Sequence, residues 1–108
     1  ALWLRHNDAE VTVVAEPMKN LGSITRAADI IVLGTGRPNI LKPDMVRDGV
    51  VIFDAGTSDV SGAVRGDADP HASARAALFT PVPGGIGPIA IAMLFQNLVV
   101  LSLKSARV

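Results

Sequence analysis

The 108-residue sequence contains no cysteine, no tyrosine, one tryptophan and three phenylalanines. Without cysteine the sequence offers no disulfide, no thiolate nucleophile and no zinc–thiolate centre, which fits a reducing compartment. With so few aromatic rings it lacks the stacking platform on which single-stranded nucleic acids bind. Its two histidines, His6 and His71, lie far apart and show no metal-ligand spacing. We therefore expect a cytoplasmic protein with no metal site and no nucleic-acid partner.

Charge of one sign is not in excess either, because ten Lys and Arg residues balance ten Asp and Glu residues. No net field therefore draws the chain to nucleic acid or to an anionic membrane. The longest apolar run, residues 86–103, contains Pro88, Gln96 and Asn97 and is short for a membrane span. We expect a buried or interface helix here and no membrane partner. The first ten residues lack the basic start and long apolar region of a signal peptide.

Apolar, β-branched runs alternate with segments of helical spacing along the chain. We predict strands over residues 9–15, 29–34, 50–56 and 78–80. We predict helices over residues 18–28, 43–49, 70–77 and 87–106, and a hairpin or irregular excursion over 58–69. The alternation predicts an α/β fold, a Rossmann-like doubly wound parallel sheet covered on both faces. Residues 1–7 resemble the end of a helix, so we expect a truncated chain whose first βα unit is missing.

In doubly wound folds ligands bind outside the carboxyl ends of the strands, which selects loops 15–18, 34–38, 54–58 and 80–88. Glu16 follows the first predicted strand, where an acidic residue accepts hydrogen bonds from the adenosine ribose in dinucleotide-binding folds. Gly34, Thr35 and Gly36 form a turn that would let a cofactor approach a strand end, although a purely structural glycine turn is commoner. The fingerprint G-x-G-x-x-G, expected about 20 residues before Glu16, would fall before residue 1.

Two further loops carry acidic residues. Asp54 is better suited to turn chemistry than to ligand contact, and Gly56 and Thr57 would then face the ligand. Asp67 and Asp69 have the i, i+2 spacing of some metal ligands, but no EF-hand pattern follows. Capping of the next helix by Asp69, just before a proline, is the better interpretation.

The segment TPVPGGIGP, residues 80–88, places three prolines and three glycines directly before the last predicted helix. Proline fixes φ, and glycine permits a close approach of a partner, so the shape of this loop matters. Its backbone N–H groups at a helix N-terminus suit an anionic or carbonyl-bearing ligand. A rigid packing turn without a ligand is about equally compatible with these residues.

Taken together, these motifs resemble the methylenetetrahydrofolate dehydrogenase/cyclohydrolase family, the bifunctional FolD proteins. The resemblance covers about residues 2–103 and is carried by ADIIVLGTGRP (28–38), DAGTS (54–58) and the highly specific PVPGGIGP (81–88). Such enzymes oxidise 5,10-methylenetetrahydrofolate with NADP or NAD and hydrolyse the methenyl product to 10-formyltetrahydrofolate. The resemblance implies a C-terminal NAD(P)-binding domain, tetrahydrofolate derivatives as partners, and a homodimer with folate in an interdomain cleft.

The resemblance also assigns roles to particular residues. Gly34, Thr35 and Gly36 would lie along the cofactor, and Thr57 would contact its nicotinamide end at a position usually held by isoleucine. The wall of the folate cleft would be formed by Pro81, Val82, Pro83, Gly84, Gly85, Ile86, Gly87 and Pro88, with a cis Val82–Pro83 bond.

Three departures from the family pattern matter. Glu16 stands where the family has the Ser or Arg that meets the 2′-phosphate of NADP, and Ala15 replaces the preceding histidine. A carboxylate there would repel that phosphate, which favours NAD. Ala90 replaces a threonine, so any hydroxyl contact there is lost. The family's catalytic lysine and tyrosine, its folate-binding aspartate and its G-R-S-x-x-V-G loop do not occur in this sequence, so it contributes no catalytic residue.

The sequence therefore predicts part of a folate dehydrogenase/cyclohydrolase that is inactive by itself. Two alternatives remain open: a non-catalytic nucleotide-binding module of the same fold, and a structural domain that dimerises through residues 87–106. Binding of cofactor without folate would distinguish the first alternative, and sedimentation with and without that helix would distinguish the second.

Overall fold

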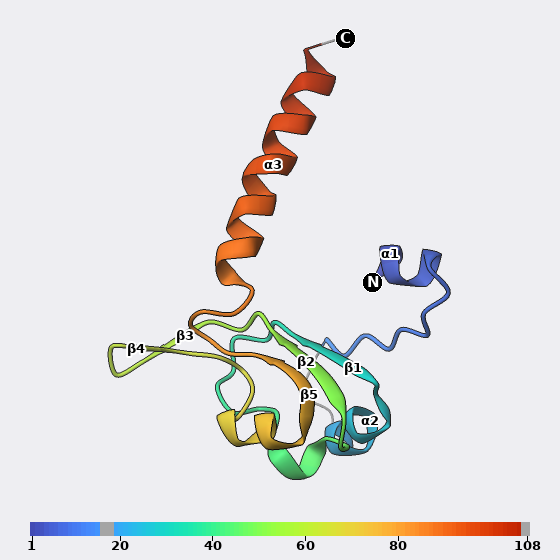
Figure 1. Cartoon of the computed structure of the whole chain (residues 1–108), viewed down its shortest axis with the longest axis vertical. Helices are drawn as coiled ribbons and strands as arrows, with labels where there is room; N and C mark the ends of the chain where they lie inside the picture. Colours follow the sequence, from blue (N-terminus) through green and yellow to red (C-terminus); the bar gives the residue numbers. More distant parts are fainter. Residues whose placement is uncertain (16–18, 107–108) are drawn as a thin grey trace.

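A computed structural model describes residues 1–15 and 19–106 of the chain (Figure 1). Its elements follow the predicted alternation of helices and strands. In chain order they are α1 (Leu2–His6), α2 (Leu21–Ala27), β1 (Ile30–Leu33), the 3-10 turn η1 (Pro43–Met45), β2 (Val50–Asp54), β3 (Ser58–Val60), β4 (Ala63–Arg65), the 3-10 helix η2 (Pro70–Arg75), β5 (Ala76–Thr80) and α3 (Gly87–Ser105).

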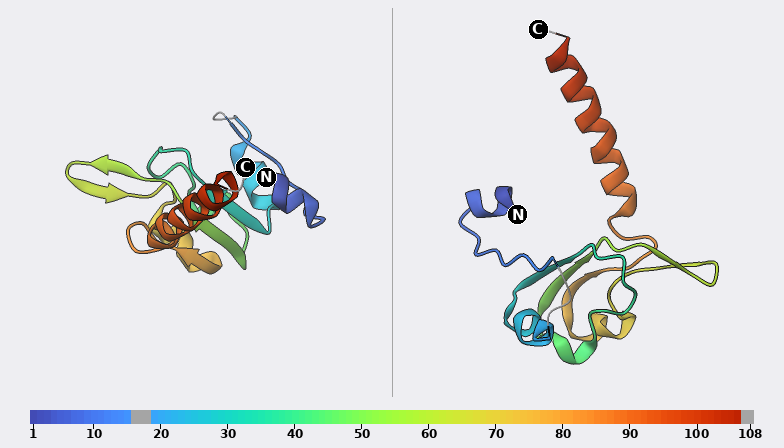
Figure 2. Two further views of the ribbon diagram at one scale, coloured as in Figure 1. Left: turned by 90° about the horizontal axis from the view of Figure 1, so that it is seen from above. Right: turned by 180° about the vertical axis from the view of Figure 1, so that it is seen from behind.

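The central element is a parallel sheet in the order β1-β2-β5. Its register places Ile31 beside Ile52 and Ile52 beside Phe79. Parallel strands need crossover connections, and the helical segments between these strands supply them. The α/β class and the parallel sheet are thus confirmed. The predicted excursion over 58–69 contains a hairpin, β3–β4, that projects from the body (Figure 2).

Two predicted helices are 3-10 segments and not α-helices. The segment predicted over 43–49 is helical only over Pro43–Met45, because Val46 is extended and Gly49 has a positive φ of 77°. The segment predicted over 70–77 is η2, and the strand β5 follows it at once. A 3-10 turn is tighter than an α-helix and occurs as a short connector, which suits these brief crossovers.

The core lies on one face of the sheet. Ile31, Leu33, Val50 and Ile52 point to this face, where they meet residues from the crossovers. Those crossover residues are Leu41, Val46, Ala68 and Ala72. Burial of these side chains is the main driving force for this part of the fold. The prediction that the apolar runs of β1 and β2 supply core residues is therefore confirmed.

The opposite face of the sheet is open in the described part of the chain, which corrects the expectation of cover on both faces. Ile30 and Val32 are 58% and 63% exposed, and Leu78 on β5 is 44% exposed. The predicted strand over 9–15 is also wrong, since these residues form no strand and are mostly exposed. A strand requires a hydrogen-bonding neighbour, and none of the described strands pairs with this segment.

The last helix, α3, extends away from the sheet in both side views (Figure 1 and the right view of Figure 2). The radius of gyration is 15.9 Å, whereas a compact chain of this length has one of about 13 Å. None of the α3 residues that the structure describes is buried, so of the two predicted alternatives the buried helix is wrong and the interface helix stays a prediction. By length and composition alone, α3 would also pass for a membrane span, a test that core helices of soluble proteins pass as well.

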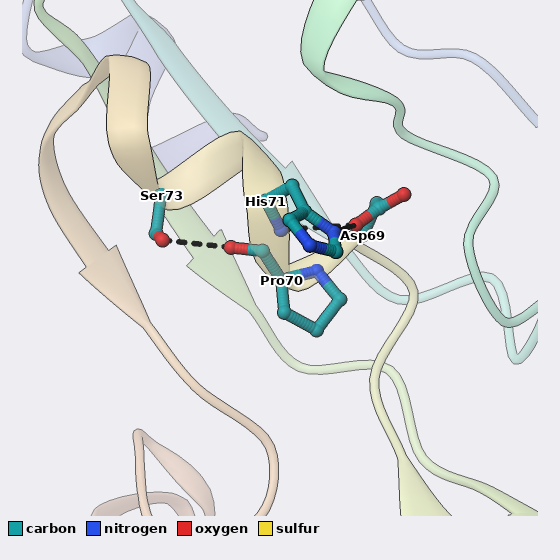
Figure 3. A network of polar contacts seen from close by, with 4 residues as sticks. All are labelled: Asp69, Pro70, His71 and Ser73. Atoms are coloured by element: carbon teal, nitrogen blue, oxygen red, sulfur yellow. Dashed lines mark hydrogen bonds and ion pairs between the residues drawn. The ribbon is translucent and has the colours of Figure 1, made fainter.

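A polar network caps η2 (Figure 3). The Asp69 carboxylate accepts a hydrogen bond from the backbone N–H of His71 at 2.9 Å and contacts the His71 ring. These bonds, the backbone bond first, lower the pKa of the Asp69 carboxyl below its usual value. The Ser73 hydroxyl closes the turn by donating to the Pro70 carbonyl at 2.7 Å. The prediction that Asp69 caps this helix is confirmed.

Candidate functional site

Three loops gather at the carboxyl end of the sheet, from which α3 also rises (Figure 2). Because β1, β2 and β5 run parallel, the segments 34–38, 55–57 and 81–86 leave the sheet at the same edge. This is the edge at which doubly wound folds bind their ligands. The fourth expected loop, 15–18, contains Glu16, and this residue lies outside the described residues.

The loop after β1 presents an open backbone. A Cβ atom added to Gly34 or Gly36 would meet nothing within 4 Å, and Gly36 has a positive φ of 67°. This loop therefore gives a ligand room to approach the main chain closely. The Thr35 hydroxyl is occupied within the protein, because it donates to Asp67 at 2.7 Å and accepts from the backbone N–H of Arg37 at 3.2 Å.

A cavity of about 250 Å³ lies beside this loop. The end of β1, the loop and α2 line it, together with Ala15. Its lining includes Leu21, Leu33, Gly34, Thr35, Arg37 and Ile40. Apolar walls with a few convergent polar groups are typical of cofactor sites. The open glycines and this cavity together leave room for a ligand beside residues 34–37.

Asp54, at the end of β2, is buried and accepts three backbone N–H groups. The donors are Gly56 at 2.9 Å, Asp67 at 3.1 Å and Ala68 at 2.8 Å. Its own N–H donates to the Thr80 hydroxyl at 2.9 Å, which ties β2 to the end of β5. The prediction that Asp54 serves turn chemistry is confirmed. Asp54 is 1% exposed, and its carboxylate holds the backbone of residues 56, 67 and 68 in place through these hydrogen bonds.

Asp67 is the residue whose importance the sequence did not reveal. Its carboxylate is completely buried, and its Oδ2 accepts the N–H of Thr35 at 2.5 Å, the Thr35 hydroxyl and the N–H of Gly36 at 3.2 Å. In the sequence, Asp67 stands out only for its i, i+2 spacing from Asp69. In the structure its neighbour Gly66 is also closely packed, since a Cβ there would overlap the Asp54 carboxylate. Asp67 thus connects the base of the hairpin to the loop after β1.

The two residues expected to face a ligand after β2 differ in their exposure. Thr57 is exposed at the loop, as expected, but Gly56 is buried. A Cβ at Gly56 would overlap the carboxylate of Asp67. Gly56 is therefore required by internal packing, and its interpretation as a ligand-facing residue is wrong. A hydrogen bond from the Ser58 hydroxyl to the Gly36 carbonyl at 2.9 Å joins this loop to its neighbour.

The proline- and glycine-rich loop ends in the first turn of α3. The Val82–Pro83 peptide bond is cis, as the resemblance implied, and Gly84 has a positive φ of 97°. A Cβ at Gly85 would overlap the Pro81 carbonyl, so this turn is closely packed. Pro88 lies in the first turn of α3, at whose start backbone N–H groups lack intrahelical acceptors. The loop thus presents a fixed surface with free donors.

The chemistry of these loops suits binding more than proton transfer. Among residues 1–15 and 19–106, no three His, Asp or Glu side chains come together as metal ligands. The two carboxylates at this edge, Asp54 and Asp67, are buried and engaged by backbone donors. Open glycines, an apolar cavity and loops at one sheet edge together define the dinucleotide-binding class of α/β domain.

Comparisons with known proteins agree with this class. Residues 1–106 match the family model described as the tetrahydrofolate dehydrogenase/cyclohydrolase NAD(P)-binding domain. The chain belongs to this family.

Curated relatives share much of the sequence. A bifunctional protein FolD of Halothermothrix orenii is 46% identical over 97 residues, which are 89% of this chain and 34% of the relative. One of Campylobacter fetus is 45% identical over 109 residues, 99% of this chain and 37% of the relative. The chain therefore spans about a third of the length of these relatives.

Solved structures agree with the fold. The FolD enzyme of Trypanosoma brucei, complexed with NADP and an inhibitor, matches with a TM-score of 0.83 and 36% identity over 97% of this chain and 39% of its own. The methylenetetrahydrofolate dehydrogenase of Bombyx mori matches with a TM-score of 0.81 and 38% identity, over 94% of this chain and 35% of its own. The Rossmann-like class is thereby confirmed.

Two glycine substitutions separate the packing role from the binding role. Gly56→Ala pushes a methyl group into the Asp67 carboxylate, and we expect it to lower the free energy of unfolding by about 1–3 kcal/mol. Gly34→Ala meets open space, so we expect a change within about 0.5 kcal/mol but weaker NAD(P) binding. Urea unfolding followed by circular dichroism, with calorimetric cofactor titration, measures both. Equal destabilisation by the two variants would contradict this assignment.

Proposed function

We propose that this chain is the NAD(P)-binding part of a methylenetetrahydrofolate dehydrogenase/cyclohydrolase and is inactive without the rest of that enzyme. The observation that carries the proposal is the convergence of the glycine loop after β1, Thr57 and the loop 81–88 at one edge of the sheet. Cofactor and folate would then lie side by side over the strand ends. The family match over residues 1–106 supports the same conclusion.

In the proposed reaction, the methylene carbon of 5,10-methylenetetrahydrofolate loses a hydride and becomes a methenyl carbon. When bound, the nicotinamide supplies the acceptor for that hydride. Water then adds to the methenyl carbon, a proton is released, and the ring opens to 10-formyltetrahydrofolate. The residues of this chain contribute by orienting the two reactants, since the rigid loop 81–88 and the loop 34–36 fix their separation.

The groups expected to act on protons lie outside this sequence. The family's catalytic lysine and tyrosine have no counterpart here, and neither does its G-R-S-x-x-V-G phosphate loop. We therefore propose that this chain supplies cofactor affinity and geometry, and that an N-terminal folate domain supplies the chemistry. A preceding βα unit would also give residues 9–15 a neighbouring strand.

The activity assay uses the full-length enzyme that contains this domain. We expect NAD(P)-dependent formation of methenyltetrahydrofolate, followed by its absorbance, and its subsequent hydrolysis. The chain of residues 1–108 serves as a control and should show no turnover. Absence of turnover by the full-length protein with both cofactors would refute the proposed function, whereas cofactor binding without folate binding would favour the non-catalytic module.

We propose NAD as the preferred cofactor, because the family resemblance aligns Glu16 with the Ser or Arg that meets the 2′-phosphate of NADP, and a carboxylate at that position would repel the phosphate. Glu16→Ser removes this repulsion and restores a hydroxyl, so we expect the ratio of kcat/KM for NADP to that for NAD to rise about tenfold. Glu10→Ser, outside the expected loop, is the matched control. A wild-type enzyme that already prefers NADP would show that the interpretation of Glu16 is wrong.

We also propose a homodimer, with α3 as the candidate interface. Ile91, Leu94, Phe95 and Leu98 all stand 59–67% exposed on this helix, and a helix that is apolar all round is normally covered. Leu98→Glu should shift the full-length enzyme from dimer to monomer in sedimentation velocity, with Asn97→Glu as the control. Unchanged sedimentation of a folded Leu98→Glu variant would remove α3 from the interface.

A further inference from the structure

The buried carboxylate of Asp67 is the feature that neither the motifs nor the proposed reaction explains. It is 0% exposed and its Oδ1 atom has no hydrogen-bond partner among residues 1–15 and 19–106. Ion pairing does not compensate it either, since none of the salt bridges in the described residues includes Asp67. A buried acceptor without a partner costs free energy, so its presence calls for an explanation.

The hydrogen bonds to the Asp67 carboxylate all come from one loop. Its Oδ2 atom receives the N–H and hydroxyl of Thr35 and the N–H of Gly36, which belong to the loop after β1. Thirty-two residues separate Thr35 from Asp67 in the sequence, so this is a tertiary contact and not local turn chemistry. Hydrogen bonds to an ionised group are shorter and stronger than neutral ones, which suits a residue that fixes a loop.

Asp67 is itself held in place by the rest of the edge. Its backbone N–H donates to Asp54 at the end of β2, and its carbonyl accepts the N–H of Leu41 at 3.3 Å. Its carboxylate also packs on Gly56, where no Cβ fits. The backbone of Asp67 is thus bound to the end of β2, while its carboxylate packs on Gly56 and accepts hydrogen bonds from Thr35 and Gly36.

We propose that Asp67 is a positioning residue for the cofactor, which it serves by fixing the shape of the loop Gly34–Gly36. This inference rests on the proposed function, because it takes that loop to be a cofactor loop. Gly34 and Gly36 keep their outer sides open to solvent, while the inner side of the loop is bound to Asp67. A loop that is already ordered by Asp67 loses less conformational entropy when the cofactor binds, so the affinity of the enzyme for the cofactor is higher.

The test compares two isosteric substitutions in the full-length enzyme. Asp67→Asn keeps the shape but replaces charge-assisted bonds by neutral ones and places an amide group where Oδ1 has no partner. We expect the Kd for the preferred cofactor, measured by calorimetry, to rise about tenfold, with KM for the folate substrate unchanged. Asp29→Asn is the matched control, because Asp29 is an exposed aspartate at the opposite end of β1.

A second variant covers the case in which Asp67→Asn does not fold. Thr35→Val replaces the hydroxyl that donates to Asp67 and accepts the Arg37 N–H by a methyl group, whereas Thr35→Ser retains it. We expect Thr35→Val to raise the cofactor Kd several-fold and Thr35→Ser to raise it clearly less. Hydrogen exchange of the backbone amides at position 35 and Gly36 should accelerate in the Thr35→Val variant but not in Thr35→Ser.

The possible results separate the two proposals. If the wild-type enzyme binds neither NAD nor NADP, the proposed function is refuted and this inference falls with it. If the wild type binds cofactor but folded Asp67→Asn binds equally well, or Thr35→Val does so where Asp67→Asn cannot be obtained folded, Asp67 has only a structural role. An equal rise of folate KM and cofactor Kd would likewise overturn a role specific to the cofactor loop.

Discussion

The carboxyl end of the sheet depends on two buried carboxylates that bind backbone N–H groups. Asp54 accepts the N–H groups of residues 56, 67 and 68, and Asp67 accepts those of residues 35 and 36. Neither forms an ion pair within the described residues. Several N–H donors can stabilise a buried carboxylate in place of a cation. The consequence is that loops following different strands form one connected unit. A displacement of the hairpin base at Asp67 would therefore shift Thr35, which is hydrogen-bonded to it.

This arrangement explains which features could be predicted from the sequence. The strands β1 and β2 and the helix α3 follow from apolar runs, and the cap at Asp69 follows from its place before Pro70. Each of these depends on neighbours within a few residues. The role of Asp67 depends on contacts with Thr35 and Gly56, which are distant in sequence, so no local pattern could reveal it. The segment 9–15 has the composition of a strand but needs a partner strand, which composition does not report.

The exposed apolar surfaces, like the segment 9–15, lack a neighbouring element to pack against within the described residues. Ile30 and Val32 belong to an apolar run that is typical of strands buried on both faces, yet the described chain covers only one face. Helix α3 is likewise apolar on all sides and uncovered. Both sequences are typical of interior elements, and contiguous exposed apolar surfaces usually mark sites of interaction. Since the chain spans about a third of its curated relatives, we interpret these surfaces as contacts with the remainder of the enzyme or with a second copy.

The strand order also constrains how the proposed ligands would lie. Neighbouring strands are about 4.8 Å apart, so the ends of β1 and β5 stand roughly 10 Å from each other with β2 between them. The loop that follows β2 therefore lies between the loop 34–36 and the loop 81–88. Ala55 and Thr57 are the exposed residues of that middle loop, and Gly56 between them is buried. A cofactor that ran from the first loop toward a folate at the third would pass this middle loop, where the family resemblance puts the nicotinamide end. The strand order thus agrees with the position that the resemblance gives Thr57, and the contact of Thr57 itself with the cofactor stays a prediction.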